Sequence, residues 1–315
     1  MPILSVAFCT YNRAPRLPAL VYALRQLNCP VPFEILAVNN NSQDNTLEVL
    51  DTLQRQPGPP LRYVTETTPG IVPARNRALT EARDSEYLVF IDDDELPHPG
   101  LIDAAYDALA HEGADCAGGR VYINFAPHGR PTWLGDDLIG FLAAIDYGDY
   151  AFWVQTEATP LWTSNIAYRM SYLRKHALCF DNRYNRQGTS ASVTGGGEDV
   201  VMLRRLLDLG AKIQYRPDMI VDHGIEPSRL NQRYFLRLHY LAGVRKGLHE
   251  LPDYPHKLFG IPPFLIRQAL QSSCKAIWMT AIRSNSALRQ GMNATHAFGL
   301  IRGFLKRQTK TEGGS

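Results

Sequence analysis

The chain has 315 residues, of which 45% are hydrophobic and 20% are charged; this is the composition of a globular protein rather than a disordered or fibrous one. The five cysteines are scattered without CxxC or metal-ligand spacing, which argues against a disulfide scaffold or a zinc site and predicts reduced thiols. The sequence shows no signal peptide and no run of about 18 uncharged apolar residues, so we predict a cytoplasmic protein without a transmembrane helix.

The net charge of +2 is unevenly distributed along the chain. The segment from Arg229 to Lys310 contains 14 Lys and Arg residues and two acids, a net charge of +12. Residues 1–228 contain 19 basic and 28 acidic residues, a net charge of −9. We therefore predict an acidic domain over residues 1–225 and a basic helical C-terminal region over residues 226–315, and such a region favours an anionic surface as its partner.

The first 110 residues alternate between predicted strands and predicted helices. Strands are expected over residues 3–9, 33–38, 61–66 and 87–91. Helices are expected over residues 15–27, 45–54, 72–83 and 99–110, with Ser42 as the N-cap of the second. The alternation predicts the α/β class with a mainly parallel central sheet flanked by helices.

The pattern loosens after residue 120. Residues 165–169 are expected to form a strand, residues 198–209 a helix, and residues 213–222 a strand that Pro217 breaks. From Arg229 onward the segments have the pattern of basic amphipathic helices.

The strand at residues 87–91 runs directly into Asp92, Asp93, Asp94 and Glu95. Two carboxylates about 4 Å apart repel each other by roughly 4 kcal/mol at an effective dielectric near 20, so this cluster does not stabilise a fold by itself. Ligands of open α/β sheets bind at the carboxyl ends of strands, and Asp92 and Asp94 can share one face of an extended stretch. We interpret Asp92 and Asp94 as two ligands of a Mg²⁺ or Mn²⁺ ion that is shared with substrate phosphates. The alternative is a solvated acidic turn before a helix N-terminus.

Polar residues also follow the two earlier strands, at Thr10–Arg13 and at Asn39–Ser42, and Arg75 and Asn76 lie in the next predicted helix. An aromatic ring, amides and an arginine near a metal can stack a base, read its edge and neutralise a diphosphate. Further along, TGGGED (194–199) places a glycine-rich loop before Glu198 and Asp199, where a carboxylate can be positioned as a general base. The alternative for these two acids is a charge pair at a helix N-terminus.

These motifs, in this order, resemble the family 2 glycosyltransferases, which have the GT-A fold. The resemblance covers about residues 3–240 and rests on SVAFCTYNR, ILAVNNNSQDNT, PGIVPARNRAL, YLVFIDDDELPHPG, TSNIAYR, GGGEDVVMLRRLLDLGAKI and IVDH. It implies an inverting, metal-dependent transfer of a sugar from a nucleotide-sugar donor, by one in-line displacement, in polysaccharide or glycoconjugate synthesis. It also implies a nucleotide-sugar-binding half over residues 1–120 and an acceptor-binding half over residues 121–225.

The resemblance implies roles for individual residues. Asp199 would be the general base that deprotonates the acceptor hydroxyl, and Glu198 would help to orient the acceptor. Asp94 would ligate the metal and His223 would complete its site, although a structural role for His223 is the alternative. The residues implied in nucleotide-sugar binding are Thr10, Tyr11, Arg13, Asn40, Arg75, Asp92 and Asp93.

Two departures from the family pattern bear on the substrates. The family often has an aspartate at position 39 or 40, whereas this chain has Asn39 and Asn40, and an amide presents a different donor and acceptor pattern to the base, which weakens the case for uracil. We still favour UDP as the nucleotide and leave GDP and dTDP open. The Gln-x-x-Arg-Trp element of processive members is not clearly present; the nearest text is Asn231–Tyr234. We therefore expect a single addition rather than polymer extrusion.

Two other functions remain as alternatives. A sugar nucleotidyltransferase would need a glycine-rich loop after the first strand, where CTYNRAPR has no glycine. A non-catalytic relative that binds nucleotide or glycan is suggested only by Asn39 and Asn40. The basic region shows no recognisable nucleic-acid motif, so no nucleic acid is predicted as a partner.

The C-terminal region and the aromatic residues bear on the acceptor. LFGIPPFLIRQALQSSCKAIWMTAI (258–282) and FGLIRGFLKR (298–307) mix apolar and basic residues, which predicts peripheral contact with an anionic membrane at the cytoplasmic face. The alternative is a helical cap packed on the catalytic domain. By resemblance, the acceptor is a saccharide or a lipid-linked saccharide. An acceptor platform or a part of the core is expected from Trp133, Tyr147, Tyr150, Trp153 and Trp162.

Overall fold

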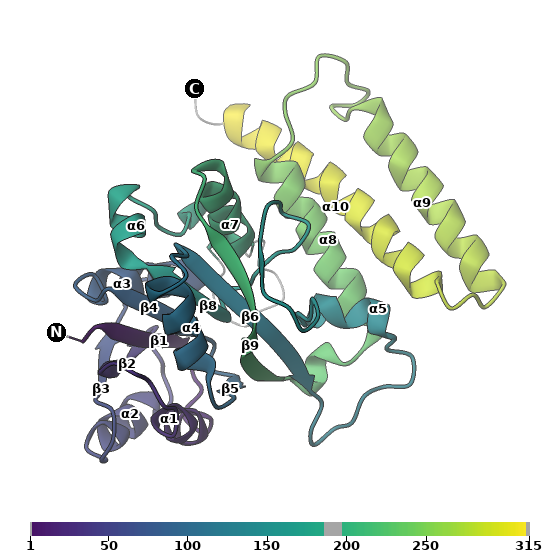
Figure 1. Cartoon of the computed structure of the whole chain (residues 1–315). Coiled ribbons are helices and arrows are strands. Elements are labelled where there is room, and N and C mark those ends of the chain that lie inside the picture. The colour runs from purple at the N-terminus through teal and green to yellow at the C-terminus, as the bar shows by residue number, and fades with distance from the viewer. Residues whose placement is uncertain (1, 186–196, 313–315) are drawn as a thin grey trace. The chain divides into compact units, whose positions relative to one another are not determined.

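The computed structural model describes residues 2–185 and 197–312. The described residues form two units, one made of residues 2–185 and 197–225 and the other of residues 226–312. The first unit contains a β-sheet with helices, and the second consists mainly of long helices (Figure 1). Within the described residues, no helix is long and apolar enough to span a membrane.

The sheet of the first unit has nine strands in the described residues. They are β1 (Leu4–Thr10), β2 (Phe33–Asn39), β3 (Leu61–Thr65), β4 (Tyr87–Ile91), β5 (Glu95–Pro97), β6 (Cys116–Asn124), β7 (Phe152–Trp153), β8 (Asn165–Arg169) and β9 (Ile213–Gly224). Their order is β3-β2-β1-β4-β8-β6-β9-β5, with β7 paired to β9. The predicted α/β class is confirmed. The parallel arrangement holds from β3 to β4 and between β6 and β9, whereas β8, β5 and β7 pair antiparallel to their neighbours.

The helices of the first unit include all five that the apolar spacing predicted, together with the short helices α5 and α6, which were not predicted. They are α1 (Leu17–Arg25), α2 (Thr46–Gln54), α3 (Ile71–Glu81), α4 (Leu101–Ala110), α5 (Asp136–Ile139), α6 (Met170–Lys175) and α7 (Glu198–Asp208). The prediction of Ser42 as the N-cap of α2 is wrong, because Asn45 occupies that position and Asp44 accepts the hydrogen bond from the Thr46 N–H. The Ser42 hydroxyl instead accepts a hydrogen bond from the N–H of Asn12.

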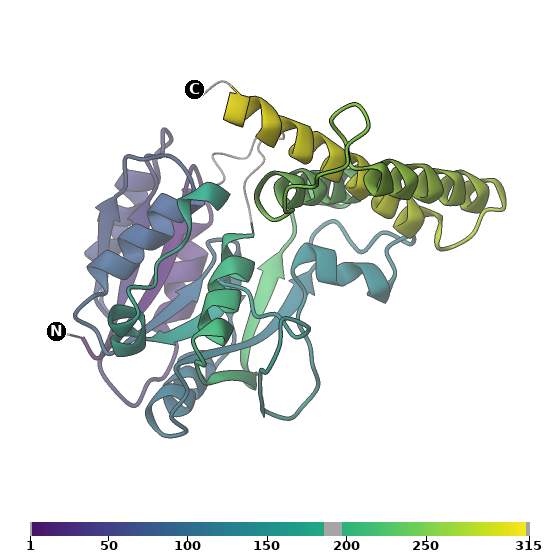
Figure 2. The same cartoon turned by 90° about the horizontal axis from the view of Figure 1, so that it is seen from above.

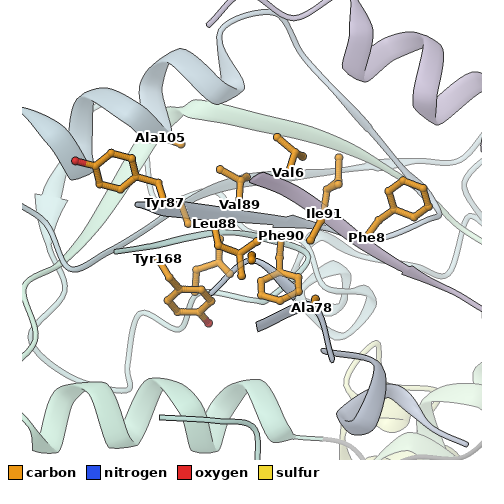
Figure 3. Packing of buried hydrophobic residues seen from close by; sticks show 14 of the residues in the cluster. Val6, Phe8, Ala78, Tyr87, Leu88, Val89, Phe90, Ile91, Ala105 and Tyr168 are labelled. Carbon is orange, nitrogen blue, oxygen red and sulfur yellow. The ribbon is translucent and has the colours of Figure 1, made fainter. Parts of the chain in front are cut away.

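Strand β4 carries the acidic turn, and it is buried along its whole length. Tyr87 on one face meets Tyr106 of α4 edge-on, at 5.7 Å between ring centroids. Phe90 on the other face contacts Tyr168 (Figure 3), and it also contacts Phe180. Because both faces of β4 are covered, all five of its residues are apolar or aromatic, and polar residues begin only where the strand leaves the sheet.

Pro217 does not break β9, contrary to the prediction, because a bulge accommodates it. The pairing of β6 with β9 shifts between Gly119, opposite Arg216, and Arg120, opposite Ile220, so residues 217–219 lie outside the ladder where a proline needs no N–H. Gly119 permits this close approach, since a Cβ there would lie 2.0 Å from the Met219 carbonyl oxygen. Beyond the bulge, β9 continues and pairs with β5.

The second unit contains α8 (Gln232–His249), α9 (Pro263–Ala281) and α10 (Ala287–Glu312), which confirms the predicted helical character. Helix α10 packs between α8 and α9 (Figure 1 and Figure 2). Glycines let α8 and α10 meet backbone to backbone: a Cβ at Gly247 would lie 2.3 Å from the Leu300 carbonyl oxygen, and one at Gly303 would lie 2.0 Å from that of Val244. Larger residues at these positions would force the helices apart.

Candidate active site

The loops that follow β1 and β2 are tied together by hydrogen bonds. The N–H of Asn12 donates to Ser42 Oγ at 2.9 Å, and the N–H of Gln43 donates to Asn12 Oδ1 at 2.7 Å. Asn12 has φ 53°, a left-handed conformation that Asn adopts more readily than most residues. The preceding ring of Tyr11 is 37% exposed, and it lines a small pocket with Asn40, Asn41, Gln43, Pro69 and Gly70.

The amide of Asn40 is engaged by the backbone around this pocket. Its Nδ2 donates to the carbonyl oxygens of Glu66 and Thr68, and its Oδ1 accepts the N–H of Gly70 at 2.7 Å. Asn39 is also buried, and its Oδ1 accepts the N–H of Ser42. Both amides therefore stabilise the pocket wall, and the ring of Tyr11 is one of the exposed side chains that a ligand could contact there.

Arg75 of α3 is buried between two carboxylates that come from distant parts of the chain. Its Nη1 lies 2.7 Å from Glu198 Oε1, and its Nη2 lies 3.3 Å from Asp92 Oδ1. The guanidinium also stacks over the ring of Phe180, whose backbone exchanges two hydrogen bonds with the Asn76 amide. Arg75 thus connects the acidic turn to the start of α7.

The acidic run forms a compact turn between β4 and β5. The N–H of Asp92 donates to Glu95 Oε2 at 3.1 Å, and the N–H of Glu95 donates to the Asp92 carbonyl oxygen at 3.2 Å. Glu95 is almost fully buried, and it lies opposite His223 in the antiparallel ladder between β5 and β9. The N–H of Gly224 donates to the Asp94 carbonyl oxygen at 2.9 Å. The turn is therefore fixed by β9 as well as by its own carboxylate.

Asp94 and His223 are brought together by this pairing. The Nε2 of His223 lies 3.6 Å from Asp94 Oδ1, and Arg16 Nη1 lies 3.7 Å from Asp94 Oδ2. His223 is buried, and neither of its ring nitrogens has a hydrogen-bond partner. A carboxylate beside a buried imidazole fits a divalent cation that takes its other ligands from a substrate. Within residues 2–185 and 197–312, however, no group of three or more His, Cys, Asp or Glu is arranged to hold a metal ion.

The carboxylates of the turn destabilise each other's charged forms. Burial, and then the charge of Asp94, raises the pKa of Asp93 to about 7, although Thr10 and Arg13 oppose the shift. Burial also raises the pKa of Asp92 despite the nearby charge of Arg75. Because burial and mutual repulsion both disfavour the charged carboxylates, a cation bound at the turn would stabilise them.

The start of α7 carries the two acids predicted for catalysis. Glu198 is buried, its Oε1 is bound by Arg75, and its Oε2 has no hydrogen-bond partner. Burial raises the pKa of Glu198, and Arg75 lowers it in part. Asp199 is half-buried, and its Oδ1 accepts the N–H of Val200 at 2.9 Å. Residues 194–196 of the predicted glycine-rich loop lie outside the described residues.

The structure brings the predicted site residues together in two groups. In the first group, Arg75 contacts both Asp92 and Glu198. In the second, His223 of β9 lies next to Asp94. Of the other predicted residues, Thr10 and Arg13 lie near Asp93, and Tyr11 and Asn40 line the small pocket. Sequence reasoning assigned no role to Arg16, Glu95 or Phe180. Glu95 belongs to the acidic run and could have been found there, but nothing local indicates that Arg16 and Phe180 reach the acids.

The aromatic stretch divides between core and surface. The ring of Tyr147 lies 6.1 Å from that of Phe152 and 5.2 Å from that of Tyr215, measured between centroids, and Trp162 packs against the core. Tyr150 and Trp153 are exposed, and Trp133 is half-buried. The rings of Tyr150 and Trp153 are therefore the most accessible candidates for contact with a sugar.

The fold of the chain is similar to that of several solved structures, including a mannosyltransferase. The mannosyltransferase PcManGT from Pyrobaculum calidifontis, in complex with GDP-Man and Mn²⁺, matches with a TM-score of 0.56 at 17% identity, over 100% of this chain and 76% of that one. Residues 1–349 of S. aureus TarS, in complex with UDP, match with a TM-score of 0.54 at 18% identity, over 98% of this chain and 91% of that one. These likenesses confirm the GT-A fold that the sequence predicted.

The sequence profile of Glycosyl transferase family 2 matches residues 5–177, and the chain belongs to this family. Glycosyltransferase AglE of Haloferax volcanii is 27% identical over 234 residues, which are 72% of this chain and 68% of AglE. The uncharacterized glycosyltransferase YfnE of Bacillus subtilis is 33% identical over 111 residues, which are 35% of this chain. The match to YfnE spans only 27% of that protein.

Proposed function

We propose that the protein transfers a sugar from a nucleotide-sugar to a saccharide or lipid-linked saccharide hydroxyl, with inversion at the anomeric carbon. The observation that carries this proposal is the buried guanidinium of Arg75, which contacts both Asp92 of the acidic turn and Glu198 at the start of α7. One arginine thereby sets the spacing between a donor-side and an acceptor-side carboxylate. Membership of Glycosyl transferase family 2 supports the reaction class.

The donor would bind at the carboxyl ends of β1, β2 and β4. The ring of Tyr11 would stack on the base, and Asp92 and Asp93 would contact the ribose or the donor sugar. We favour a UDP-sugar, with GDP and dTDP as the other candidates; TarS and PcManGT are described with UDP and with GDP-Man respectively. Asp94 and His223 would hold Mg²⁺ or Mn²⁺, which supplies positive charge to the leaving diphosphate when bound.

Asp199 would act as the general base. In a single displacement, an acceptor oxygen forms a bond to the anomeric carbon while the bond from that carbon to the diphosphate oxygen breaks. Asp199 takes the proton of the attacking hydroxyl, and the nucleotide diphosphate leaves with the electron pair. The Oδ1 atom of Asp199 accepts a hydrogen bond from the Val200 N–H, so the backbone of α7 orients this carboxylate. Glu198, fixed by Arg75, would orient the acceptor, and Arg75 would be a positioning residue.

Donor binding can be tested without knowing the acceptor. Calorimetry would measure the binding of UDP, GDP and dTDP, each with and without Mn²⁺, to the wild type, Asp94→Asn and Asp103→Asn. Asp103 is an exposed acid on α4 and serves as the matched control. We expect one nucleotide to bind tightly only with Mn²⁺, to the wild type and Asp103→Asn but not to Asp94→Asn. If no nucleotide binds to the wild type under either condition, the proposed function is wrong.

The role of Asp199 can be tested through hydrolysis of the nucleotide-sugar identified in this way, with water as the acceptor. Loss of a general base lowers a rate by about 10²–10⁴-fold, so Asp199→Asn should release nucleotide diphosphate that much more slowly and still bind the donor. Asp208→Asn, an exposed acid on the same helix, is the control and should be unchanged. Equal rates for the two variants would remove Asp199 as the base.

A further inference from the structure

Helix α9 of the second unit has an apolar face that the described residues leave uncovered. Leu265 and Ala269 are buried on its inner side. Large apolar side chains nevertheless recur along its outer side, where Trp278 is 59% exposed. The exposed members on the helix and at its end are Phe264, Leu270, Ile277, Trp278 and Ile282. A helix of 19 residues is about 28 Å long, so this face is extended rather than a single exposed side chain.

A tight turn before α9 continues the apolar surface. The backbones of Leu258 and Ile261 exchange two hydrogen bonds, at 2.8 and 2.9 Å. Phe259 at the tip of this turn has φ 52° and is 89% exposed. A left-handed conformation is unfavourable for a bulky residue, so the turn holds an aromatic ring in solvent by means of a strained backbone.

The charged residues on α9 and directly after it are all basic. The sequence contains no acid between Asp253 and Glu312. Arg267, Lys275 and Arg283 are exposed on or next to α9, and no carboxylate of the described residues forms an ion pair with them. Apolar and aromatic side chains interleaved with unpaired basic ones are the pattern of a helix that lies in the interface of an anionic bilayer.

We propose that α9 and the turn at Leu258–Ile261 form a docking face for an anionic lipid bilayer. The apolar side chains would enter the headgroup region, with Trp278 at the interface, and the three basic side chains would contact lipid phosphates. A second copy of the chain is a poor occupant, because two such faces would oppose like charges. The inference rests on the second unit alone and does not depend on the proposed sugar transfer.

Vesicle co-sedimentation of the full chain tests this proposal. We expect binding to phosphatidylcholine vesicles containing phosphatidylglycerol, weak binding to phosphatidylcholine alone, and weaker binding as the salt concentration rises. Replacing Arg267, Lys275 and Arg283 together by Gln should lower the partition coefficient about a hundredfold, the loss expected for three basic side chains at an anionic surface. Phe259→Ser, Ile277→Ser and Trp278→Ser combined should abolish binding to both kinds of vesicle.

Matched controls separate docking from general stickiness or misfolding. Tyr22→Ser combined with Tyr150→Ser removes two exposed aromatic rings from the first unit and should leave vesicle binding unchanged. Circular dichroism should show native helix content in each variant, because every substituted side chain is exposed. The proposal is overturned if the wild type binds neither vesicle, or if both α9 variants bind like the wild type. It is also overturned if light scattering shows a wild-type dimer that the apolar variant converts to a monomer, since the face would then be a self-interface.

Discussion

Charged residues of the first unit are held against one another, whereas several basic residues of the second unit face solvent without a carboxylate. Arg75 lies between two acids, and Arg62 is paired with Glu34 and Glu81. In the second unit, by contrast, α8 and α10 are joined by backbone contact at glycines. We infer that the stability of the first unit depends on charge balance around its site. The stability of the second unit depends on glycines, which leave room for the backbones of its helices to meet.

Among the changes that test this comparison of the two units, Arg75→Met should cause the largest loss of stability. Removing one partner of a buried ion pair leaves an uncompensated charge, here on Glu198 and Asp92, and typically costs about 3–5 kcal/mol. Urea unfolding of the full chain would measure this loss. Arg77→Met on the same helix removes a half-buried pair with Glu81 and should cost about 1 kcal/mol or less.

The double variant Arg75→Met with Glu198→Gln isolates the charge contribution. Because Gln removes the uncompensated charge on Glu198, the double variant should be more stable than Arg75→Met alone. If Arg75→Met were as stable as Arg77→Met, charge balance would not be what stabilises the site region.

The corresponding change in the second unit is Gly247→Ala. A new Cβ would lie 2.3 Å from the Leu300 carbonyl oxygen, which is backbone and cannot move aside without separating α8 from α10. Overpacking of this kind costs about 1–3 kcal/mol, and protection of α8 and α10 from hydrogen–deuterium exchange should fall accordingly. Gly291→Ala is the control: its Cβ would meet only the Leu236 side chain, at 3.0 Å. Equal protection in the two variants would show that backbone contact does not hold this helix pair.

Much of this arrangement was accessible from the sequence, and its limits have physical causes. Four strands and four helices of the first 110 residues were predicted because apolar spacing is local information, whereas the short strand β5 was not predicted. The acidic turn was visible as Asp92–Glu95. The partner of each charge was not predictable, since Arg75 and Glu198 are separated by 123 positions in the chain. The amide of Asn40 illustrates the same limit: its chemistry suits a ligand, yet the fold uses it to bind backbone.

Substitution of Glu95, to which the sequence analysis assigned no role, should have a smaller effect on the stability of the first unit. Its Oε2 accepts the N–H of Asp92 from a buried position, so Glu95→Ala would leave that N–H without its partner at a cost of about 1–2 kcal/mol. Glu95→Gln keeps a carbonyl acceptor of the same length and should retain most of the stability. Urea unfolding of both variants would measure the difference. Equal losses for Ala and Gln would show that the carboxylate charge, rather than the hydrogen bond, fixes the turn.

The smallest expected effect is on the pH dependence of stability. As the pH falls, the half-buried histidines of the second unit should lower its stability, whereas Glu198 should raise that of the first unit. Burial lowers the pKa of His239 and of His296 below the usual 6.5; the neighbouring positive charges that add to these shifts are those of His296, Arg289, Lys246 and Arg245. The unfolded chain therefore binds more protons below pH 6.5, so the stabilisation from both histidines is complete above pH 6.5 and is lost as the pH falls through their lowered pKa values. Glu198 has a raised pKa, so its charged form costs stability at higher pH, and that cost diminishes as the pH falls towards 4.5.

Hydrogen–deuterium exchange between pH 8 and pH 5, corrected for the intrinsic rate, reports on each unit separately. Opening free energies of α8 and α10 should fall with pH in the wild type, and His239→Gln combined with His296→Gln should remove most of that fall. His256→Gln, at an exposed position of the same unit, should retain it. In peptides from β4 and α7, Glu198 should make the opening free energy rise as the pH falls. Glu198→Gln should remove this contribution. If both units lost stability together, and the histidine variants followed the wild type, the two regions would share one source of pH dependence and the contrast between them would not extend to protonation.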